Sequence, residues 1–351
     1  MTLPLPTRRT LHRRGALAAL LAFAAGAARA SDDRDHGEHS EDNMAAGPLR
    51  IVVAYPPGGV SDAIARALAA ELSLRLGVPV QVENRPGAGG AIALRSLARA
   101  LADGRMLVLS AVTPLALDPQ LRARPAAEGA RGGHAPLVAP VAPVAGVMLT
   151  PSLLVGTTAF RGRSFADLLA IARERPGGLR WATSGIATTG HLILEEVRAA
   201  GGIVVTHVPY KGGGQQLTDA LAGQFELLST NVGTLQLRYV RSGRFKALAV
   251  GAPRRVPQLP DVPTLAELGF PRANLASRFG LFAPGGTAPE RLRRLNAAVD
   301  AALQQPAIRE ALLEAGSLPL GGSAEAFADE IARSNAQIAR AWPSASRRPA
   351  N

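Results

Sequence analysis

A glycine-rich turn between a buried strand and a helix is the feature that most constrains how this chain folds. The apolar run over residues 51–54 predicts a strand, and apolar residues spaced by four over 64–76 predict a helix that Gly77 ends. Between them stands the sequence YPPGGVSD, residues 55–62. The first N–H groups of a helix lack intrahelical partners, and paired glycines let a ligand approach them. The turn predicts either an anion-sized pocket at a helix N-terminus or a tight βα turn whose glycines serve only geometry.

The same rhythm repeats downstream. Short strands are predicted over residues 78–82 and 106–110. Between them lie a second glycine-rich loop, 84–90, and a predicted helix, 91–101. This βαβαβ order predicts a parallel sheet with helices on both faces. Ligands of such sheets bind beyond the carboxyl ends of the strands, where both glycine-rich loops and Thr113 are expected to lie.

A second α/β unit follows. It begins with a capping box at residues 164–167 and continues through alternating strands and helices to about residue 250. Between the two units, the apolar residues 137–155 contain prolines, which favours edge strands or a crossover. Two further helices, near 289–304 and 324–342, have no strands of their own. The predicted fold class is therefore α/β, with two interleaved lobes and a ligand cleft between them.

The chain is predicted to have a leader, a linker, two lobes and a tail. Residues 1–30 have a basic start, a short apolar stretch and an A-x-A site, which together predict a secretory signal peptide for the general route, with a twin-arginine route as the alternative. Residues 31–47 are polar and acidic and are predicted to be a disordered linker. The remaining boundaries are lobe 1 over 48–146 and 275–342, lobe 2 over 147–274, and a disordered tail over 343–351.

Charge and cysteine content exclude some classes of protein. The chain has a formal net charge of +12, and the residues from Met44 onward carry the same excess. This basic balance suits an anionic ligand, and it also fits an arginine-rich genome. Basic and aromatic residues are not interleaved as on a nucleic-acid surface, so no nucleic-acid partner is predicted. Cysteine is absent, which excludes a disulfide framework and thiolate chemistry.

Enzyme motifs are incomplete in this chain. Residues 59–63 lack the second glycine of a nucleophile elbow, and residues 87–90 lack the later glycine of a dinucleotide fingerprint. His191 and His207 have no further ligands at metal spacing. The sequence therefore predicts no catalysis, cofactor or metal. A secreted hydrolase or transferase using Ser61 or His191 is the alternative.

Two helix starts are the candidate site. Ser61 and Asp62 open one predicted helix, while Ser184, Thr188 and Thr189 precede another in the second unit. Facing each other across a cleft, their hydroxyls and free N–H groups would clamp a molecule with two carboxylates. The alternative is that they are plain N-caps. Asp62 would repel a carboxylate but accept an ammonium group or a water, or serve only as an acid in the first turn of its helix.

Seven ordered motifs resemble the periplasmic substrate-binding receptors of the tripartite tricarboxylate transporters, the Bug family. They are Tyr55–Asp62, Val82–Gly90, Trp181–Leu192, His207–Gly212, Ala247–Val250, Leu259–Thr264 and Phe279–Pro284. The resemblance covers about Leu49 to Trp342. It implies a type II periplasmic-binding-protein fold and a monomer in the periplasm that captures a small carboxylate, such as a di- or tricarboxylate, an acidic amino acid or an aromatic acid. It further implies delivery to a membrane permease pair, with a sensor that signals without transport as the alternative.

The resemblance also implies a set of ligand contacts. In the family, ligand carboxylates are held largely by backbone amides and ordered waters of these loops. Two departures stand out: Ala187 replaces a glycine found in many relatives, and Tyr55 replaces a frequent phenylalanine, which adds a hydroxyl to the cleft. Residues 122–147 fit the family poorly, and the sequence does not name the ligand. The implied contacts are Tyr55, Gly58, Gly59, Ser61, Asp62, Ala88, Gly89, Gly90, Ser184, Gly185, Thr188, Thr189, Tyr210 and Asn231.

Overall fold

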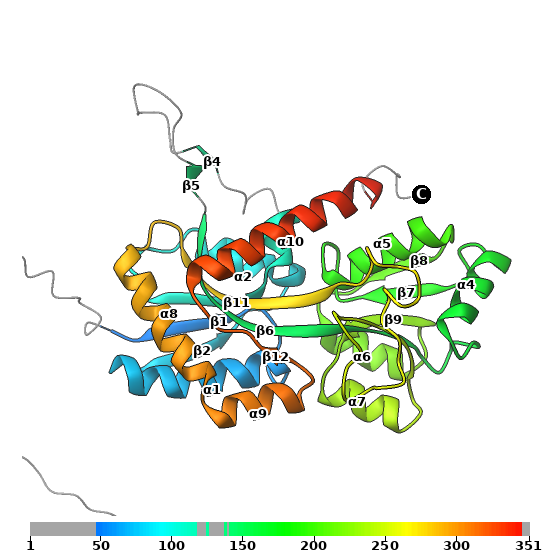
Figure 1. The fold of residues 1–351 in the computed structure, drawn as a ribbon, viewed down its shortest axis with the longest axis horizontal. Coiled ribbons are helices and arrows are strands. Elements are labelled where there is room, and N and C mark those ends of the chain that lie inside the picture. Colours follow the sequence, from blue (N-terminus) through cyan, green and yellow to red (C-terminus); the bar gives the residue numbers. More distant parts are fainter. Residues whose placement is uncertain (1–46, 118–123, 126–136, 139, 346–351) are drawn as a thin grey trace, which may run out of the picture. The chain divides into compact units, whose positions relative to one another are not determined.

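A computed structural model describes residues 47–117, 124–125, 137–138 and 140–345 (Figure 1). The chain divides into residues 1–42 and residues 43–351, and all described elements belong to the second unit. The predicted signal peptide and almost all of the predicted linker lie outside the described residues. Within the described part, no helix is both long and apolar enough to cross a membrane.

Alternating strands and helices make up most of the described chain. The strands are β1 (Leu49–Val53), β2 (Val80–Asn84), β3 (Met106–Ala111), β4 (Arg124–Pro125), β5 (Leu137–Val138), β6 (Val141–Gly156), β7 (Arg180–Thr183), β8 (Thr206–Pro209), β9 (Leu227–Asn231), β10 (Lys246–Gly251), β11 (Ala276–Pro284) and β12 (Leu318–Pro319). The helices are α1 (Val60–Leu76), η2 (Ala88–Gly90, a 3₁₀ turn), α2 (Ala91–Leu97), α3 (Thr113–Leu117), α4 (Phe165–Glu174), α5 (Thr189–Gly201), α6 (Gly213–Leu221), α7 (Thr234–Arg241), α8 (Pro289–Leu303), α9 (Pro306–Glu314) and α10 (Ala324–Ala345).

The first lobe is built on β1, β2 and β3, which are parallel as predicted, on β11, which runs antiparallel to β3, and on β6, which pairs antiparallel with β11 and so runs in the same direction as β3. β1 is buried on both faces, so its apolar run does not alternate with polar residues. Ile51 and Val53 pack in one core with α1, α8 and α9, while Val52 packs in a second core with α2 and α10. This sheet is therefore a layer covered by helices on both faces (Figure 1).

The second lobe repeats the arrangement with β9, β7 and β8 in parallel order. Trp181 on β7 is fully buried in a core with α4 and α5, whereas its neighbour Ala182 packs in the core formed with α6 and α7. The capping box at residues 164–167 is present, with Ser164 Oγ accepting a hydrogen bond from Asp167 N. Two α/β lobes are thus present, as the sequence predicts.

Strand β6 links the two lobes, and its predicted role needs a correction. The interpretation as a crossover is right, because β6 pairs with β11 up to Pro151 and with β9 from Ser152 onward (Figure 1). The interpretation as edge strands is wrong, because β6 lies between β11 and β9 in the sheet order. The prolines are tolerated because Pro143 stands at a register irregularity and Pro151 stands where β6 changes partner.

Helix α10 contacts both lobes. Phe327 and Ile331 pack in the first lobe, and Ile338 packs in the core of the second lobe. The helix extends to Ala345, three residues beyond the predicted end of the ordered chain, and the rest of the predicted tail lies outside the described residues. The C-terminal helix therefore covers the junction between the lobes (Figure 1).

Candidate functional site

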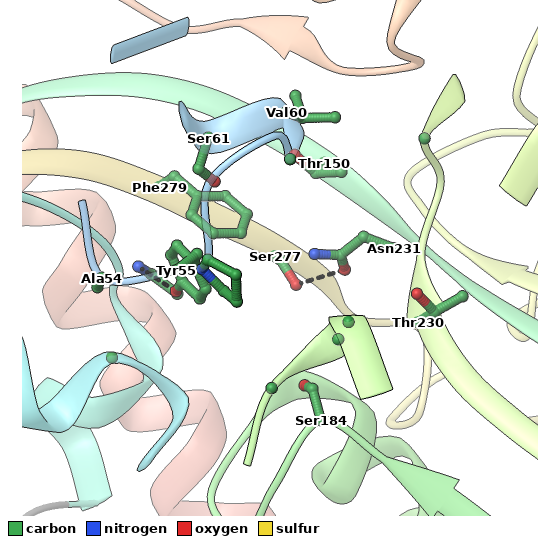
Figure 2. A pocket seen from close by; sticks show the side chains of 18 of the residues that line it. Ala54, Tyr55, Val60, Ser61, Thr150, Ser184, Thr230, Asn231, Ser277 and Phe279 are labelled. Carbon is green, nitrogen blue, oxygen red and sulfur yellow. Dashed lines mark hydrogen bonds between the residues drawn. The ribbon is translucent and has the colours of Figure 1, made fainter. Parts of the chain in front are cut away.

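A cavity of about 550 Å³ lies between the two lobes. The first lobe contributes the loops that follow β1, β2 and β3, and the second lobe contributes those that follow β7, β8 and β9. Figure 2 shows Tyr55 and Ser61 of the first lobe and Ser184 of the second. These are the carboxyl ends of the parallel strands, where the sequence placed its candidate site. The predicted site residues in the cavity wall are Tyr55, Gly58, Gly59, Ser61, Gly89, Gly90, Thr113, Ser184, Thr188, Thr189 and Asn231.

Helices α1, α5, α6 and α7 all begin at this cavity. Three of them have a glycine at the N-cap, so no side chain accepts a hydrogen bond from their first N–H groups; these caps are Gly59, Gly212 and Gly233. In α5, by contrast, Thr188 Oγ1 accepts from His191 N at 3.4 Å. Open N–H groups at helix N-termini attract anions. The cavity is therefore suited to a ligand with negative charge.

Tyr55 lines the cavity with its ring, and its hydroxyl is engaged elsewhere. The ring packs edge-on against Phe279 at 5.5 Å between centroids. The hydroxyl accepts a hydrogen bond from Ala111 N at 3.0 Å, and burial raises its pKa to about 12. The hydroxyl that Tyr55 adds thus ties the 55–62 loop to β3 through Ala111 N.

Asp62 is not part of the cavity wall. Its carboxylate accepts hydrogen bonds from Gly58 N and Asn84 Nδ2, both at 2.9 Å, and pairs with Arg66 at 3.1 Å. Burial alone would raise the pKa of this carboxyl, but hydrogen bonds from Gly58, Arg66 and Asn84 outweigh it and lower the pKa. The geometry supports the interpretation of Asp62 as an acid of the first helical turn that folds the 55–62 loop.

Three other predicted residues also lie outside the wall. Ala88 and Gly185 shape the turns that carry their neighbours, with backbone φ of +47° and +142°. Tyr210 donates a hydrogen bond to Asp219 at 2.7 Å, and burial, followed by Asp219, raises its pKa to about 12. The structure therefore places Tyr210 in the body of the second lobe.

The two lobes touch directly around the cavity. Thr113 Oγ1 of the first lobe and Thr189 Oγ1 of the second form a buried hydrogen bond of 3.3 Å. Gly89 has φ of +63°, and a Cβ added there would lie 3.0 Å from Thr188 Cγ2 across the lobe boundary. Gly89 therefore meets two demands, a left-handed backbone and a close approach of the lobes.

Asn231 and Ser277 connect the strands that run beneath the cavity. Ser277 Oγ donates to Asn231 Oδ1 at 2.9 Å, and Figure 2 shows the two side chains meeting beside Phe279. An amide with its oxygen engaged still has two N–H donors. Asn231 is therefore placed to donate toward the cavity.

Several wall residues were not predicted. Among the described wall residues, only Lys211 and Glu314 carry charged side chains. Gln216 is buried on α6, where its Nε2 donates to Ser229 O at 3.2 Å. Lys211 belongs to the motif His207–Gly212, so the sequence could have indicated it as a wall residue. Glu314 lies at the end of α9, a helix that the sequence analysis did not assign, and no local signal ties it to the cavity.

The arrangement does not resemble a hydrolase site. Within the described residues, no histidine or carboxylate lies within hydrogen-bond distance of the Ser61 hydroxyl, and no cluster of three metal-binding side chains is present. A nucleophilic serine requires a neighbouring base. The geometry is that of a binding site built from helix starts and hydroxyls.

Comparison with known proteins gives a consistent result. The family model described as "Tripartite tricarboxylate transporter family receptor" matches residues 64–341. Protein BugT of Bordetella pertussis is 34% identical over 299 residues, which are 84% of this chain and 89% of BugT.

Solved structures match over nearly their whole length. Rpa4515 of R. palustris, solved with adipate, has a TM-score of 0.73 and 30% identity, with 86% of this chain and 98% of that chain covered. MatC of Rhodopseudomonas palustris, solved with bound malate, has a TM-score of 0.72 and 28% identity, with 85% and 99% covered. The predicted periplasmic-binding-protein fold is confirmed.

Proposed function

The chain belongs to the receptor family of the tripartite tricarboxylate transporters, and from this premise we propose that it captures a small carboxylate and delivers it to a membrane permease. The predicted family resemblance is confirmed, and the chain is a solute-binding receptor and not an enzyme. The capture site is the cavity between the lobes. Delivery of the ligand to a permease is supported by family membership alone.

The single observation that carries the carboxylate proposal is the set of glycine-capped helix starts at the cavity. Gly59, Gly212 and Gly233 leave backbone N–H groups from both lobes without side-chain partners. Charge-assisted hydrogen bonds from such groups are stronger than neutral ones. A carboxylate held from both lobes favours their closed arrangement. Adipate and malate, found in the two solved relatives, are both dicarboxylates.

The remainder of the ligand would face a mainly apolar wall. Phe279, Met148, Val60 and the ring of Tyr55 line the cavity between its polar groups. Backbone N–H groups recognise the carboxylate, while these side chains favour a short hydrocarbon body. The expected class is therefore a small acid with an aliphatic or aromatic body, and a second carboxylate fits the helix starts of the opposite lobe.

We propose that the predicted site residues that line the cavity contact the ligand. Asp62, Ala88, Gly185 and Tyr210, which lie outside the wall, support these residues. We also propose the lobe boundaries given from the sequence, with lobe 1 over 48–146 and 275–342 and lobe 2 over 147–274. The predicted signal peptide supports a periplasmic location, where a monomer would meet both its ligand and the permease.

Thermal shift of the purified receptor tests the proposal. The panel contains malate, adipate, citrate, glutamate and benzoate, each compared with its amide, which keeps the shape and removes the charge. At least one acid is expected to raise the melting temperature while its amide does not. A folded, ligand-free receptor that no carboxylate stabilises would contradict the proposal. Native mass spectrometry of freshly purified protein checks for a retained acid.

A further inference from the structure

Two histidines, His191, which is buried, and His207, which is partly buried, bond to residues beside the cavity without lining it. His191 is on α5 and His207 is on β8, and their rings stack in parallel with centroids 4.5 Å apart and planes 9° apart. Neither is among the described wall residues. The proposed function gives no role to this pair.

Both rings support residues 184–188, His191 by a direct hydrogen bond and His207 through Thr183. His191 Nδ1 accepts a hydrogen bond from Ala187 N at 3.2 Å. Ala187 has φ of +62°, a left-handed conformation that is unfavourable for a residue with a Cβ. A hydrogen bond to its amide therefore stabilises a backbone conformation that alanine would otherwise avoid.

His207 supports the same segment through Thr183. Its Nε2 lies 2.7 Å from Thr183 Oγ1, and this hydroxyl bonds to both the N–H and the C=O of Gly185, at 3.3 and 3.2 Å. Ser184 and Thr188, which stand between these anchored peptides, line the cavity. The two imidazoles thus fix the backbone that presents two wall hydroxyls.

The surroundings favour neutral rings. The charged groups that act on the pair are Glu195, 3.7 Å from His191 Nε2, and Arg198, which pairs with Glu195 at 2.8 Å. The pKa of both histidines is lowered to about 4, chiefly by burial and also by Arg198; for His207 the neighbouring His191 also lowers the pKa while Glu195 opposes. Parallel rings at this distance strongly disfavour two positive charges.

We propose that His191 and His207 are positioning residues, which hold residues 184–188 in the ligand-binding conformation, and that protonation of His191 releases this segment. A proton on His191 Nδ1 would face the Ala187 N–H and remove its acceptor. The segment would lose its hold on the ligand, and affinity would fall in acid. The affinity part rests on the proposed carboxylate function, whereas the positioning part does not.

Two variants separate positioning from packing. His191→Asn places an amide oxygen near the position of Nδ1 and does not titrate, while His191→Phe keeps a stacking ring and removes the acceptor. In ligand-free receptor at pH 7, hydrogen exchange of the 184–188 amides is expected to be about tenfold faster in H191F than in wild type, and near wild type in H191N. Helix α4 serves as an internal control, because its exchange should be the same in all three proteins.

Affinity for an acid found by thermal shift is then measured at pH 7.5 and 4. Comparison at equal pH cancels the titration of the acid itself. Because the pKa of His191 is about 4, about half of the ligand-free receptor carries this proton at pH 4, so wild type is expected to lose about twofold relative to H191N, and H191F is expected to bind weakly at both values. If H191F exchanges like wild type, or if H191N loses affinity in parallel with wild type, the proposal is overturned. If no acid binds but H191F still exchanges faster, positioning stands and the carboxylate function fails.

Discussion

The two walls of the cavity are fixed by different chemistry. In the first lobe, the 55–62 loop is held by the carboxylate of Asp62, which bonds to Gly58, Asn84 and Arg66. In the second lobe, the 184–188 segment is held by neutral imidazoles. The Asp62 carboxylate, whose pKa is lowered, keeps its hydrogen bonds down to low pH. The Ala187 N–H, by contrast, loses its acceptor once His191 takes up a proton. The first wall is therefore the constant part of the site and the second wall the adjustable part.

Removing the Asp62 carboxylate from the first wall should have the largest effect on stability and ligand affinity. Asp62→Ala leaves Gly58 N and Asn84 without their buried acceptor, and we expect a loss of about 2–3 kcal/mol in the free energy of unfolding. Ligand affinity should fall by about 100-fold, because the loop before α1 loses its shape. Urea unfolding and calorimetric titration measure the two effects.

Asp167→Ala is the matched control for this change. Asp167 is also a first-turn acid that bonds to its loop backbone, but it opens α4, which has no residue in the cavity wall. This variant should lose some stability and keep wild-type affinity. Equal loss of affinity in both variants would mean that the first wall has no special role.

The next largest effect is expected where the two walls meet. Gly89→Ala adds a Cβ 3.0 Å from Thr188 Cγ2 at a backbone φ of +63°. The clash should hold the lobes apart and weaken binding by roughly tenfold. Gly77→Ala is the control, since Gly77 has φ of +70° and nothing within 4 Å of an added Cβ. It should cost about 1 kcal/mol of stability and leave affinity unchanged.

These walls also show what the sequence could predict. The glycine-rich turns and apolar runs predicted the βα units, and the C-cap at Gly77 is confirmed in its left-handed conformation. Local periodicity carries such information because each unit buries its own apolar face. The helix starts at both walls followed directly from these units.

Other parts depend on contacts between distant residues. Helix α9 brings Glu314 to the cavity wall opposite residues 232–236, and no local pattern links these segments. The prolines of β6 predicted edge strands or a crossover, because prolines usually exclude a central position, yet both prolines stand where the pairing of a central strand is interrupted. The role of Asp62 was open for the same reason, since Asn84 reaches it from the end of a neighbouring strand.

The pH dependence of stability should separate the walls. The histidine pKa is about 4 in the folded protein and near 6.5 in the unfolded chain, so the unfolded state binds more protons between these values. The contribution of the two histidines to the free energy of unfolding should therefore be complete above about pH 6.5. It should decrease as the pH drops toward 4 and change little below 4. The contribution of Asp62 to stability is lost at lower pH. Its pKa in the folded protein lies below the ordinary value of 3.8, so this contribution decreases only as the pH falls below 3.8.

Urea unfolding at pH 7, 5.5 and 4.5 measures the upper window. The variant H191N should flatten part of the decline, and the double variant with His207→Gln should flatten most of it. An unchanged decline in the double variant would assign the acid sensitivity to other groups.

The smallest effect is expected at the hydrogen bond that joins the walls. Thr113→Val keeps the shape of the side chain and removes one hydroxyl of the buried pair with Thr189. Affinity should fall by about threefold to tenfold, mainly through faster ligand release, because the bond exists only while the lobes are together. Thr189→Val should do the same, and the double variant should be no worse than either single variant, since it leaves no buried hydroxyl unpaired. Stopped-flow release kinetics measure the coupling, and strictly additive losses would show that the two hydroxyls act on the ligand separately and do not join the walls.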